Sequence, residues 1–181
     1  MHKDIEKILY SEQDIKNIVK RLAKEVEKDY NGKDFIMVGL LKGCVSFMVD
    51  LMREVNLDFS IDFLAVSSYG NSTVSSGRVN IQKDISTSVD GKHILIVEDI
   101  VDSGRTLAFI SQYLYAKNAA SVKICTLFNK PDRRVTDIDV AYVGSVSPDA
   151  FIVGYGLDYA ERYRNLPYVG VLKESVYSQD T

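Results

Sequence analysis

Three carboxylates fall within five positions of one stretch of the chain. Residues 94–107 read ILIVEDIVDSGRTL and contain Glu98, Asp99 and Asp102. Acids this close repel one another, so each needs a partner of its own. Carboxylate oxygens can bind Mg²⁺, accept hydrogen bonds from sugar hydroxyls or take up a proton. The stretch could do any of these, and the alternative is a solvated strand end with Asp102 as a helix cap.

The residues after the last acid have the composition of a phosphate-binding turn. They are Ser103, Gly104, Arg105 and Thr106. They lead into a predicted helix over 104–117, and the N–H groups at a helix start are unpaired and suit a phosphate. Glycine allows close backbone approach, and the two hydroxyls add donors. The spacing fits neither the GxxxxGKS/T nor the GxGxxG motif.

Alternating strands and helices are predicted to position these residues. The predicted strands are 35–40, the alternating Phe59, Ile61 and Phe63, 93–98, 122–128, 140–144, 151–155 and 168–172. The predicted helices are one capped by Ser11 and ended by Asn31-Gly32, one at 43–54 with Val45, Met48, Val49 and Met52 on one side, and 104–117. This order predicts an α/β fold with a mostly parallel sheet. Ligands bind beyond the carboxyl ends of such strands, where the acids stand.

One segment is too polar to bury much surface. SSYGNSTVSSG (67–77) draws nine of its eleven residues from Ser, Gly, Asn and Thr. Both a solvated loop and a lid over a site have this composition.

Length, composition and net charge limit the class of protein that this chain can be. The chain of 181 residues is 46% hydrophobic and 26% charged, which predicts a single globular domain over 1–181. Its net charge of −3 argues against a protein that coats nucleic acid. No apolar run approaches the ~20 residues of a membrane-spanning helix, and the N-terminus lacks a signal-peptide core. We therefore expect a cytoplasmic protein, with Cys44 and Cys125 as buried thiols rather than reactive or paired ones.

The acidic stretch closely resembles the phosphoribosyl diphosphate signature of the type I phosphoribosyltransferases. In that signature an apolar strand precedes two acids, two small or apolar residues, and then Asp, Ser or Thr, Gly, any residue and Thr. Five further segments stand in the order and spacing of the bacterial hypoxanthine(-guanine) branch of that family: LLKG (40–43), SSYGNS (67–72), NKPDRR (129–134), FIVGYGLDY (151–159) and YRNLP (163–167). The resemblance spans roughly residues 8 to 173. It implies a β-rich hood formed by the N-terminal segment and about 129–173, and a mobile lid at about 67–77.

The resemblance also implies how the acids divide their tasks. Glu98 and Asp99 face the ribose 2′- and 3′-hydroxyls, directly and through Mg²⁺-bound water. The segment from Ser103 to Thr106, which includes Gly104 and Arg105, wraps the 5′-phosphate. Asp102 lies near N7 of a purine and acts there as general base or acid.

Other residues are implied on the pyrophosphate side. The resemblance places Leu41, Lys42 and Gly43 there, with a cis Leu41–Lys42 peptide that aims N–H groups at pyrophosphate. Ser68 and Tyr69 close over the diphosphate as part of the lid. Asp158 binds a second Mg²⁺, and Arg164 contacts pyrophosphate.

The base is implied to lie against the hood. Lys130 donates to the purine 6-oxo group, Phe151 stacks on the ring, and backbone groups of Ile152 meet the 2-position edge. Without the resemblance, Lys130 would be part of a surface turn with solvated Arg133 and Arg134, and Phe151 would be a core residue. Residue 150 is alanine, where relatives often have a charged or longer polar side chain.

These inferences predict a purine salvage enzyme. It would transfer the 5-phosphoribosyl group of 5-phosphoribosyl 1-diphosphate to hypoxanthine, and to guanine, with Mg²⁺ and release of pyrophosphate. The resemblance further implies a homo-oligomer, dimer or tetramer. The alternatives are a regulator of the same fold that senses phosphoribosyl diphosphate and binds nucleic acid, and a transferase for another base, xanthine included.

Overall fold

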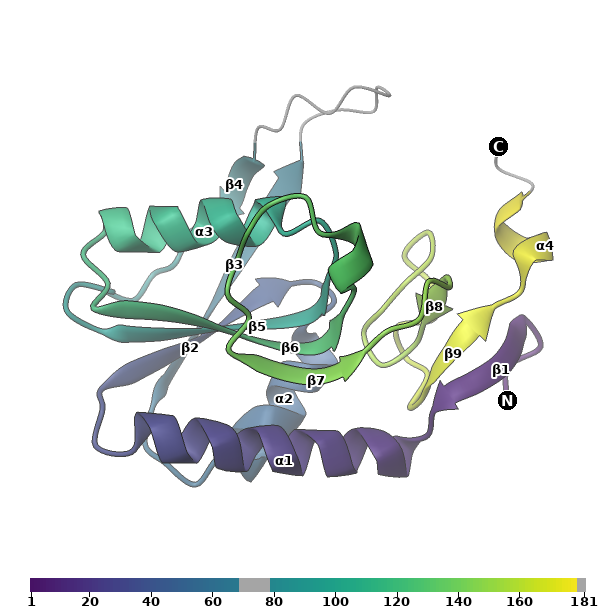
Figure 1. Ribbon diagram of the computed structural model, residues 1–181, viewed down its shortest axis with the longest axis horizontal. Helices are drawn as coiled ribbons and strands as arrows, with labels where there is room; N and C mark the ends of the chain where they lie inside the picture. The colour runs from purple at the N-terminus through teal and green to yellow at the C-terminus, as the bar shows by residue number, and fades with distance from the viewer. Residues whose placement is uncertain (69–78, 179–181) are drawn as a thin grey trace.

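A six-stranded sheet forms the centre of the molecule (Figure 1). In spatial order its strands are β4 (Val79–Lys83), β3 (Ser60–Ser68), β2 (Phe35–Leu41), β5 (His93–Val101), β6 (Ser121–Asn129) and β7 (Tyr142–Val146). All neighbours run parallel except β4, which is antiparallel to β3 at the edge. The computed structural model describes residues 1–68 and 79–178. The predicted α/β fold with a mostly parallel sheet is confirmed.

Helices cover both faces of this sheet. Figure 1 shows α1 (Glu12–Tyr30) and α2 (Val45–Glu54) on one face and α3 (Arg105–Ala116) on the other. As the sequence predicts, Ser11 caps α1: its hydroxyl accepts from the N–H of Asp14, and the Asp14 carboxylate accepts from the N–H of Ser11. No helix in the described part of the chain is long and apolar enough to span a membrane.

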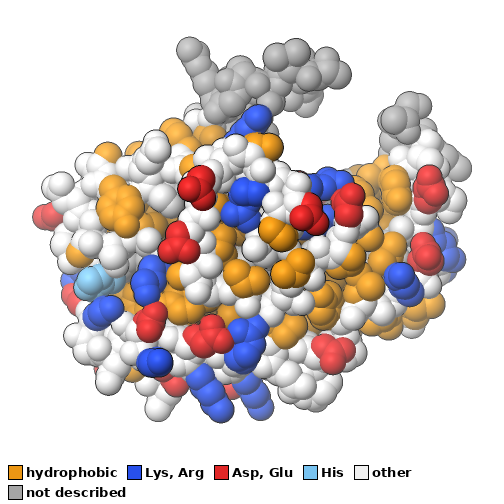
Figure 2. Space-filling view, viewed as in Figure 1, with side chains coloured by type: hydrophobic (Ala, Val, Ile, Leu, Met, Phe, Trp, Pro, Cys, Tyr) orange, Lys and Arg blue, Asp and Glu red, His pale blue; other side chains and the backbone are white. Residues whose placement is uncertain are grey.

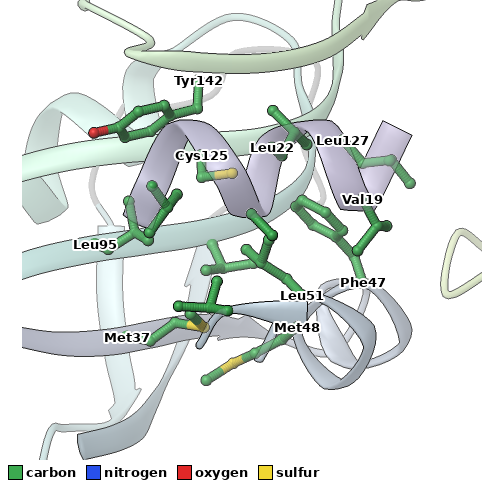
Figure 3. Close-up of a cluster of buried hydrophobic side chains, with 14 of the residues drawn as sticks. Val19, Leu22, Met37, Phe47, Met48, Leu51, Leu95, Cys125, Leu127 and Tyr142 are labelled. Carbon is green, nitrogen blue, oxygen red and sulfur yellow. The ribbon is translucent and has the colours of Figure 1, made fainter. Parts of the chain in front are cut away.

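The larger core lies between the sheet and the first two helices (Figure 3). Val19 and Leu22 of α1 and Cys125 of β6 point into it. Cys44 is also buried, and neither cysteine is in a disulfide. Burial raises the pKa of both thiols, which keeps them protonated. The prediction of buried, unpaired cysteines is therefore confirmed.

The buried side of α2 differs from the one expected. Phe47, Met48 and Leu51 are buried, whereas Val45 is 42% exposed. The expected set of four and the buried set of three share Met48 and both have helical spacing, so periodicity could not choose between two adjacent stripes. The packing decides: Phe47, Met48 and Leu51 belong to the core between the sheet and α1, and Met52 of the expected set packs at its margin.

A small antiparallel sheet lies beside the large one (Figure 1). Its order is β1 (Ile5–Tyr10), β9 (Val169–Leu172) and β8 (Ile152–Val153), and the short helix α4 (Glu174–Tyr177) follows β9. We call these four elements the hood. The range 129–173, expected to form the hood, therefore divides, because β7 pairs with β6 in the large sheet.

Several element bounds differ from the predicted ones for local reasons. β5 continues past the expected end at 98 to Val101, because its pairing with β6 continues through the acids. The strand expected at 151–155 keeps only two residues, since Gly154 and Tyr155 have φ of 102° and 52°. Four elements were not predicted from the sequence: β1, β4, α4 and the short 3-10 helix η1 (Pro131–Arg133). The predicted lid falls mostly on residues 69–78, which lie outside the described residues.

Candidate active site

The site lies where connections leave the sheet in opposite directions. From β2 the chain passes through α2 to β3, and from β5 it passes through α3 to β6 on the other side. The carboxyl ends of β2 and β5 therefore flank a switch point, the usual place for ligands in open α/β sheets. LLKG (40–43) and the three acids occupy these two strand ends.

A small cavity of about 130 Å³ opens at the turn between β5 and α3. Its lining is Glu98, Ile100, Val101, Asp102, Ser103, Gly104, Thr106 and Leu107. Gly104 has φ of +81°, and a Cβ there would come within 2.9 Å of Arg134 and 3.0 Å of the Thr136 carbonyl. Glycine is therefore required for both conformation and space.

A loop beyond β6 holds this turn from outside. The carbonyl of Ser103 accepts from the N–H groups of Val135 and Thr136, at 3.1 and 3.2 Å. Arg134 Nε donates to the carbonyl of Asp102 at 3.1 Å, and its guanidinium also donates to Asn129. The expectation of a solvated Arg134 is therefore wrong, because a turn carbonyl outside the helix ladder offers it an acceptor.

The two strand-end acids are poorly compensated. Asp99 is 9% exposed, and its Oδ1 accepts from the N–H of Ile100 at 2.9 Å. Burial raises the pKa of Asp99 to about 6, although N–H donors and Arg164 lower it. Burial and then the charge of Asp99 raise the pKa of Glu98 well above its ordinary value. Among the described residues, Glu98 Oε2 has no hydrogen-bond partner.

LLKG lies directly against these acids. A Cβ on Gly43 would stand 1.8 Å from Oδ2 of Asp99, so only glycine leaves room for that carboxyl group. The Leu41–Lys42 peptide is cis, as the resemblance implies. Lys42 Nζ pairs with Glu161 at 3.0 Å. This ion pair links the end of β2 to the loop between β8 and β9.

That loop also carries Asp158 and Arg164. Arg164 Nη2 is 3.0 Å from Asp158 Oδ1, and Nη1 donates to the carbonyl of Gly156 at 2.7 Å. The charges of both residues act on Asp99, Arg164 lowering its pKa and Asp158 raising it. A Cβ on Gly156 would lie 2.1 Å from the carbonyl of Gly43, so loop and strand end are in close contact.

A larger cavity of about 510 Å³ lies between this edge and the hood. Its lining is Asp99, Ile100, Asp102, Lys130, Arg133, Asp149, Ala150, Phe151, Ile152, Leu157, Asp158 and Tyr177. Asp102 is exposed, and Lys130 Nζ donates to the carbonyl of Ala150 at 3.1 Å. Phe151 is 40% exposed, which excludes the alternative of a core residue.

The predicted residues are not all brought together equally. The larger cavity gathers Asp99, Asp102, Lys130, Phe151, Ile152 and Asp158. Leu41, Lys42, Gly43 and Arg164 line neither cavity. Gly43 lies against Asp99, Arg164 pairs with Asp158, and Lys42 pairs with Glu161. Arg105 is exposed at the start of α3, and Ser68 ends β3, whereas Tyr69 lies outside the described residues. Ile100, Arg134, Glu161 and Tyr177 were missed, and no sequence signal marked them.

The oxygen ligands present suit Mg²⁺ when a substrate supplies the rest. Within the described residues, no three acidic, histidine or cysteine side chains form a cluster that could hold a metal alone. Mg²⁺ commonly takes only one or two protein carboxylates and completes its shell with water and substrate phosphates. The unpartnered oxygen of Glu98 and the adjacent Asp99 and Asp158 fit that pattern.

Comparisons with known proteins agree over nearly the whole chain. Residues 6–160 match the model of the phosphoribosyl transferase domain. Hypoxanthine-guanine phosphoribosyltransferases of Streptococcus thermophilus and Streptococcus pyogenes are 50% and 52% identical over 179 residues, 99% of each chain. A solved hypoxanthine phosphoribosyltransferase from Staphylococcus aureus is 49% identical with a TM-score of 0.94, covering 98% of this chain and 96% of that one. The bifunctional protein TilS/HprT of Listeria monocytogenes is 50% identical over 179 residues, and this chain spans 28% of its length.

Proposed function

The chain belongs to the phosphoribosyltransferase family, and from this premise we propose that it is a purine salvage enzyme. It transfers the 5-phosphoribosyl group from 5-phosphoribosyl 1-diphosphate to hypoxanthine, and also to guanine, giving IMP or GMP and pyrophosphate. The observation that carries the proposal is the cavity in which Asp102, Lys130 and Phe151 meet. An acid, a cation and an accessible ring are the groups that a 6-oxopurine requires.

The sugar and its phosphate are held at the end of β5. The backbone N–H groups of the turn around Gly104 and the hydroxyls of Ser103 and Thr106 donate to the 5′-phosphate. Glu98 and Asp99 accept from the ribose hydroxyls, which supply a donor for Glu98 Oε2, an atom without a partner among the described residues.

The base is held between the strand end and the hood. The Lys130 ammonium donates to the 6-oxo group and so favours a carbonyl over the amine of adenine. Phe151 stacks on the ring, and the backbone of Ile152 meets its 2-position edge. Asp102 takes the proton from N7 as the purine nitrogen bonds to C1′ and the C1′–oxygen bond to pyrophosphate breaks.

The pyrophosphate side needs positive charge. Backbone N–H groups of LLKG (40–43) and the Arg164 guanidinium donate to the departing anion, and Ser68 and Tyr69 close over it. Glu98 and Asp99 would hold one Mg²⁺ through water on the ribose side, and Asp158 would hold a second on the pyrophosphate side. When bound, these ions would supply charge stabilisation for the leaving group.

The proposal extends to the compartment, the oligomeric state and the partners of the chain. Two unpaired thiols favour the reducing cytoplasm. A homo-oligomer, dimer or tetramer, is proposed, and sedimentation measures it directly. A nucleic-acid-binding regulator is disfavoured, because acidic and basic side chains are interspersed on the face shown in Figure 2 and the net charge is −3.

A base panel tests the proposal. The protein, Mg²⁺ and phosphoribosyl diphosphate are mixed separately with hypoxanthine, guanine, xanthine, adenine and uracil, and pyrophosphate release is followed. We expect turnover with hypoxanthine and guanine. Tight phosphoribosyl diphosphate binding without turnover of any base would favour the regulator instead, and its nucleic-acid affinity should then fall steeply with salt.

A further inference from the structure

The ring of Phe151 stands outside the core and needs other support. It precedes β8, and its backbone is fixed to β9 because its carbonyl accepts from the N–H of Leu172 at 2.9 Å. The side chain is 40% exposed, so no close-packed interior sets its rotamer. A stacking platform that rotates freely must be ordered when the base binds, which weakens binding.

Two tyrosine rings contact Phe151. Tyr177 lies nearly parallel to it, with ring centroids 5.2 Å apart and planes at 23°. Tyr159 meets it edge-on, at 5.4 Å and 87°. A flat ring has two faces, and the nearly parallel neighbour takes one of them, so a single face is left for a base.

Tyr177 is firmly placed and borders the site. It ends α4, where Val176 and Tyr177 pack against Ile5, Val153 and Leu172 of the hood. The Tyr177 side chain also lines the cavity that contains Asp102 and Lys130. It therefore belongs both to the hood packing and to the wall of the base site.

We propose that Tyr177 is a positioning residue for the base. Its ring covers one face of Phe151 and fixes the plane on whose other face the purine stacks. Residues 6–160 match the domain shared by the family, so this support comes from outside the matched range. The inference rests on the proposed function, since it assumes that a purine occupies the larger cavity.

Kinetics of three variants test the role of the ring. Tyr177→Ala should raise KM for hypoxanthine about five- to tenfold, the loss expected for one aromatic pair, and leave KM for phosphoribosyl diphosphate and kcat nearly unchanged. Tyr177→Phe keeps the ring and should behave as the wild type. Val176→Ala is the matched control, because it thins the packing of α4 but removes no cavity-lining group.

Binding measurements separate this inference from the proposed function. Calorimetry with IMP and with ribose 5-phosphate should show that Tyr177→Ala weakens IMP binding by about the same factor and leaves ribose 5-phosphate binding unchanged. If the wild type binds IMP but turns over no base, the proposed function fails and the variant still tests the ring. If Tyr177→Ala binds IMP as tightly as the wild type, the inference fails and the function stands.

Three further results would overturn the inference. A lower KM for hypoxanthine in Tyr177→Ala would mean that the tyrosine occupies the place of the base instead of supporting Phe151. An equal rise in KM in Val176→Ala would mean that only the packing of α4 matters. Wild-type protein that binds neither IMP nor any base would overturn both proposals together.

Discussion

Two buried carboxyl positions in the same sheet are treated in opposite ways. Asp62 of β3 is 6% exposed, and both of its oxygens accept hydrogen bonds. Its donors are the N–H groups of Phe63, Ser86 and Thr87, the Ser86 hydroxyl and the Lys83 ammonium, at 2.7 to 3.2 Å. Burial alone would raise the pKa of Asp62, but these donors outweigh it and hold the pKa below its ordinary value.

The acids at the end of β5 lack such a shell. Burial raises the pKa of both Glu98 and Asp99, and Glu98 Oε2 has no partner among the described residues. The same sheet can thus satisfy a buried carboxylate where the role is structural. At the end of β5 the protein leaves a buried carboxylate without enough partners, and we infer that a ligand supplies them. This is the physical argument for assigning the sugar and Mg²⁺ to the carboxyl end of β5.

The largest effect is expected at Asp102, which is exposed and so differs from both the satisfied Asp62 and the buried acids Glu98 and Asp99. Asp102→Asn keeps the shape but removes the proton acceptor, so kcat should fall about 100-fold or more. Phosphoribosyl diphosphate binding and the free energy of unfolding should change little. Steady-state kinetics and calorimetry measure these quantities, with the exposed Asp132→Asn as control. Gly104 is the N-cap of α3 and no side chain caps this helix, so the alternative of Asp102 as a helix cap is wrong. Unchanged kcat would mean that Asp102 takes no part in the proton transfer.

Asp62→Asn should lower stability without lowering kcat, because the role of Asp62 is structural. Asparagine has one oxygen, so its amide N–H₂ would face donors that now meet a carboxylate. The free energy of unfolding should fall by about 4 kcal/mol in urea titrations, while kcat of the folded protein stays the same. The exposed Asp58→Asn is the matched control. A loss of kcat without a loss of stability would place Asp62 with the functional acids.

Asp99→Asn should show the opposite behaviour. A folded-state pKa of about 6, above the ordinary value near 4, means that ionising Asp99 destabilises the fold as pH rises through this window. Without Mg²⁺, the variant should therefore be more stable than the wild type by up to about 3 kcal/mol at pH 7, and the difference should vanish near pH 4. Urea titrations at both pH values measure it, and turnover should be lost. A variant less stable than the wild type at pH 7 would contradict the comparison.

The smallest effect concerns the glycine that shapes the phosphate turn. Gly104→Ala combines a left-handed φ with close contacts and should lower the free energy of unfolding by about 2 kcal/mol. It should also raise KM for phosphoribosyl diphosphate. Gly91→Ala has φ of +68° but open space around its Cβ, so it measures the backbone cost alone, about 1 kcal/mol. If Gly104→Ala and Gly91→Ala changed stability and KM by the same amounts, the close contacts around Gly104 would have no effect of their own.

Elements were predicted correctly where a continuous run of apolar residues, or a capped helical repeat of them, marks the element. The apolar strands 35–40, 93–98 and 122–128 and the capped first helix were found, although β5 runs three residues further than expected. The buried side of α2 was misjudged, because two stripes of similar hydrophobicity differ only in what lies opposite. β1 and β4 were missed, because their sequences mix charged and apolar residues and only a partner strand makes them strands.

By itself, the sequence determined the residues of the turn from Glu98 to Thr106, because a strand, an acid pair and a helix start are all local. It also determined the composition that excludes a highly basic protein. Only the tertiary structure decided that Arg134 braces the turn and that Phe151 is accessible rather than buried. It alone brought Tyr177 to the same cavity as Asp102. These relations join residues far apart in the chain, and the packing of the hood against the sheet sets them.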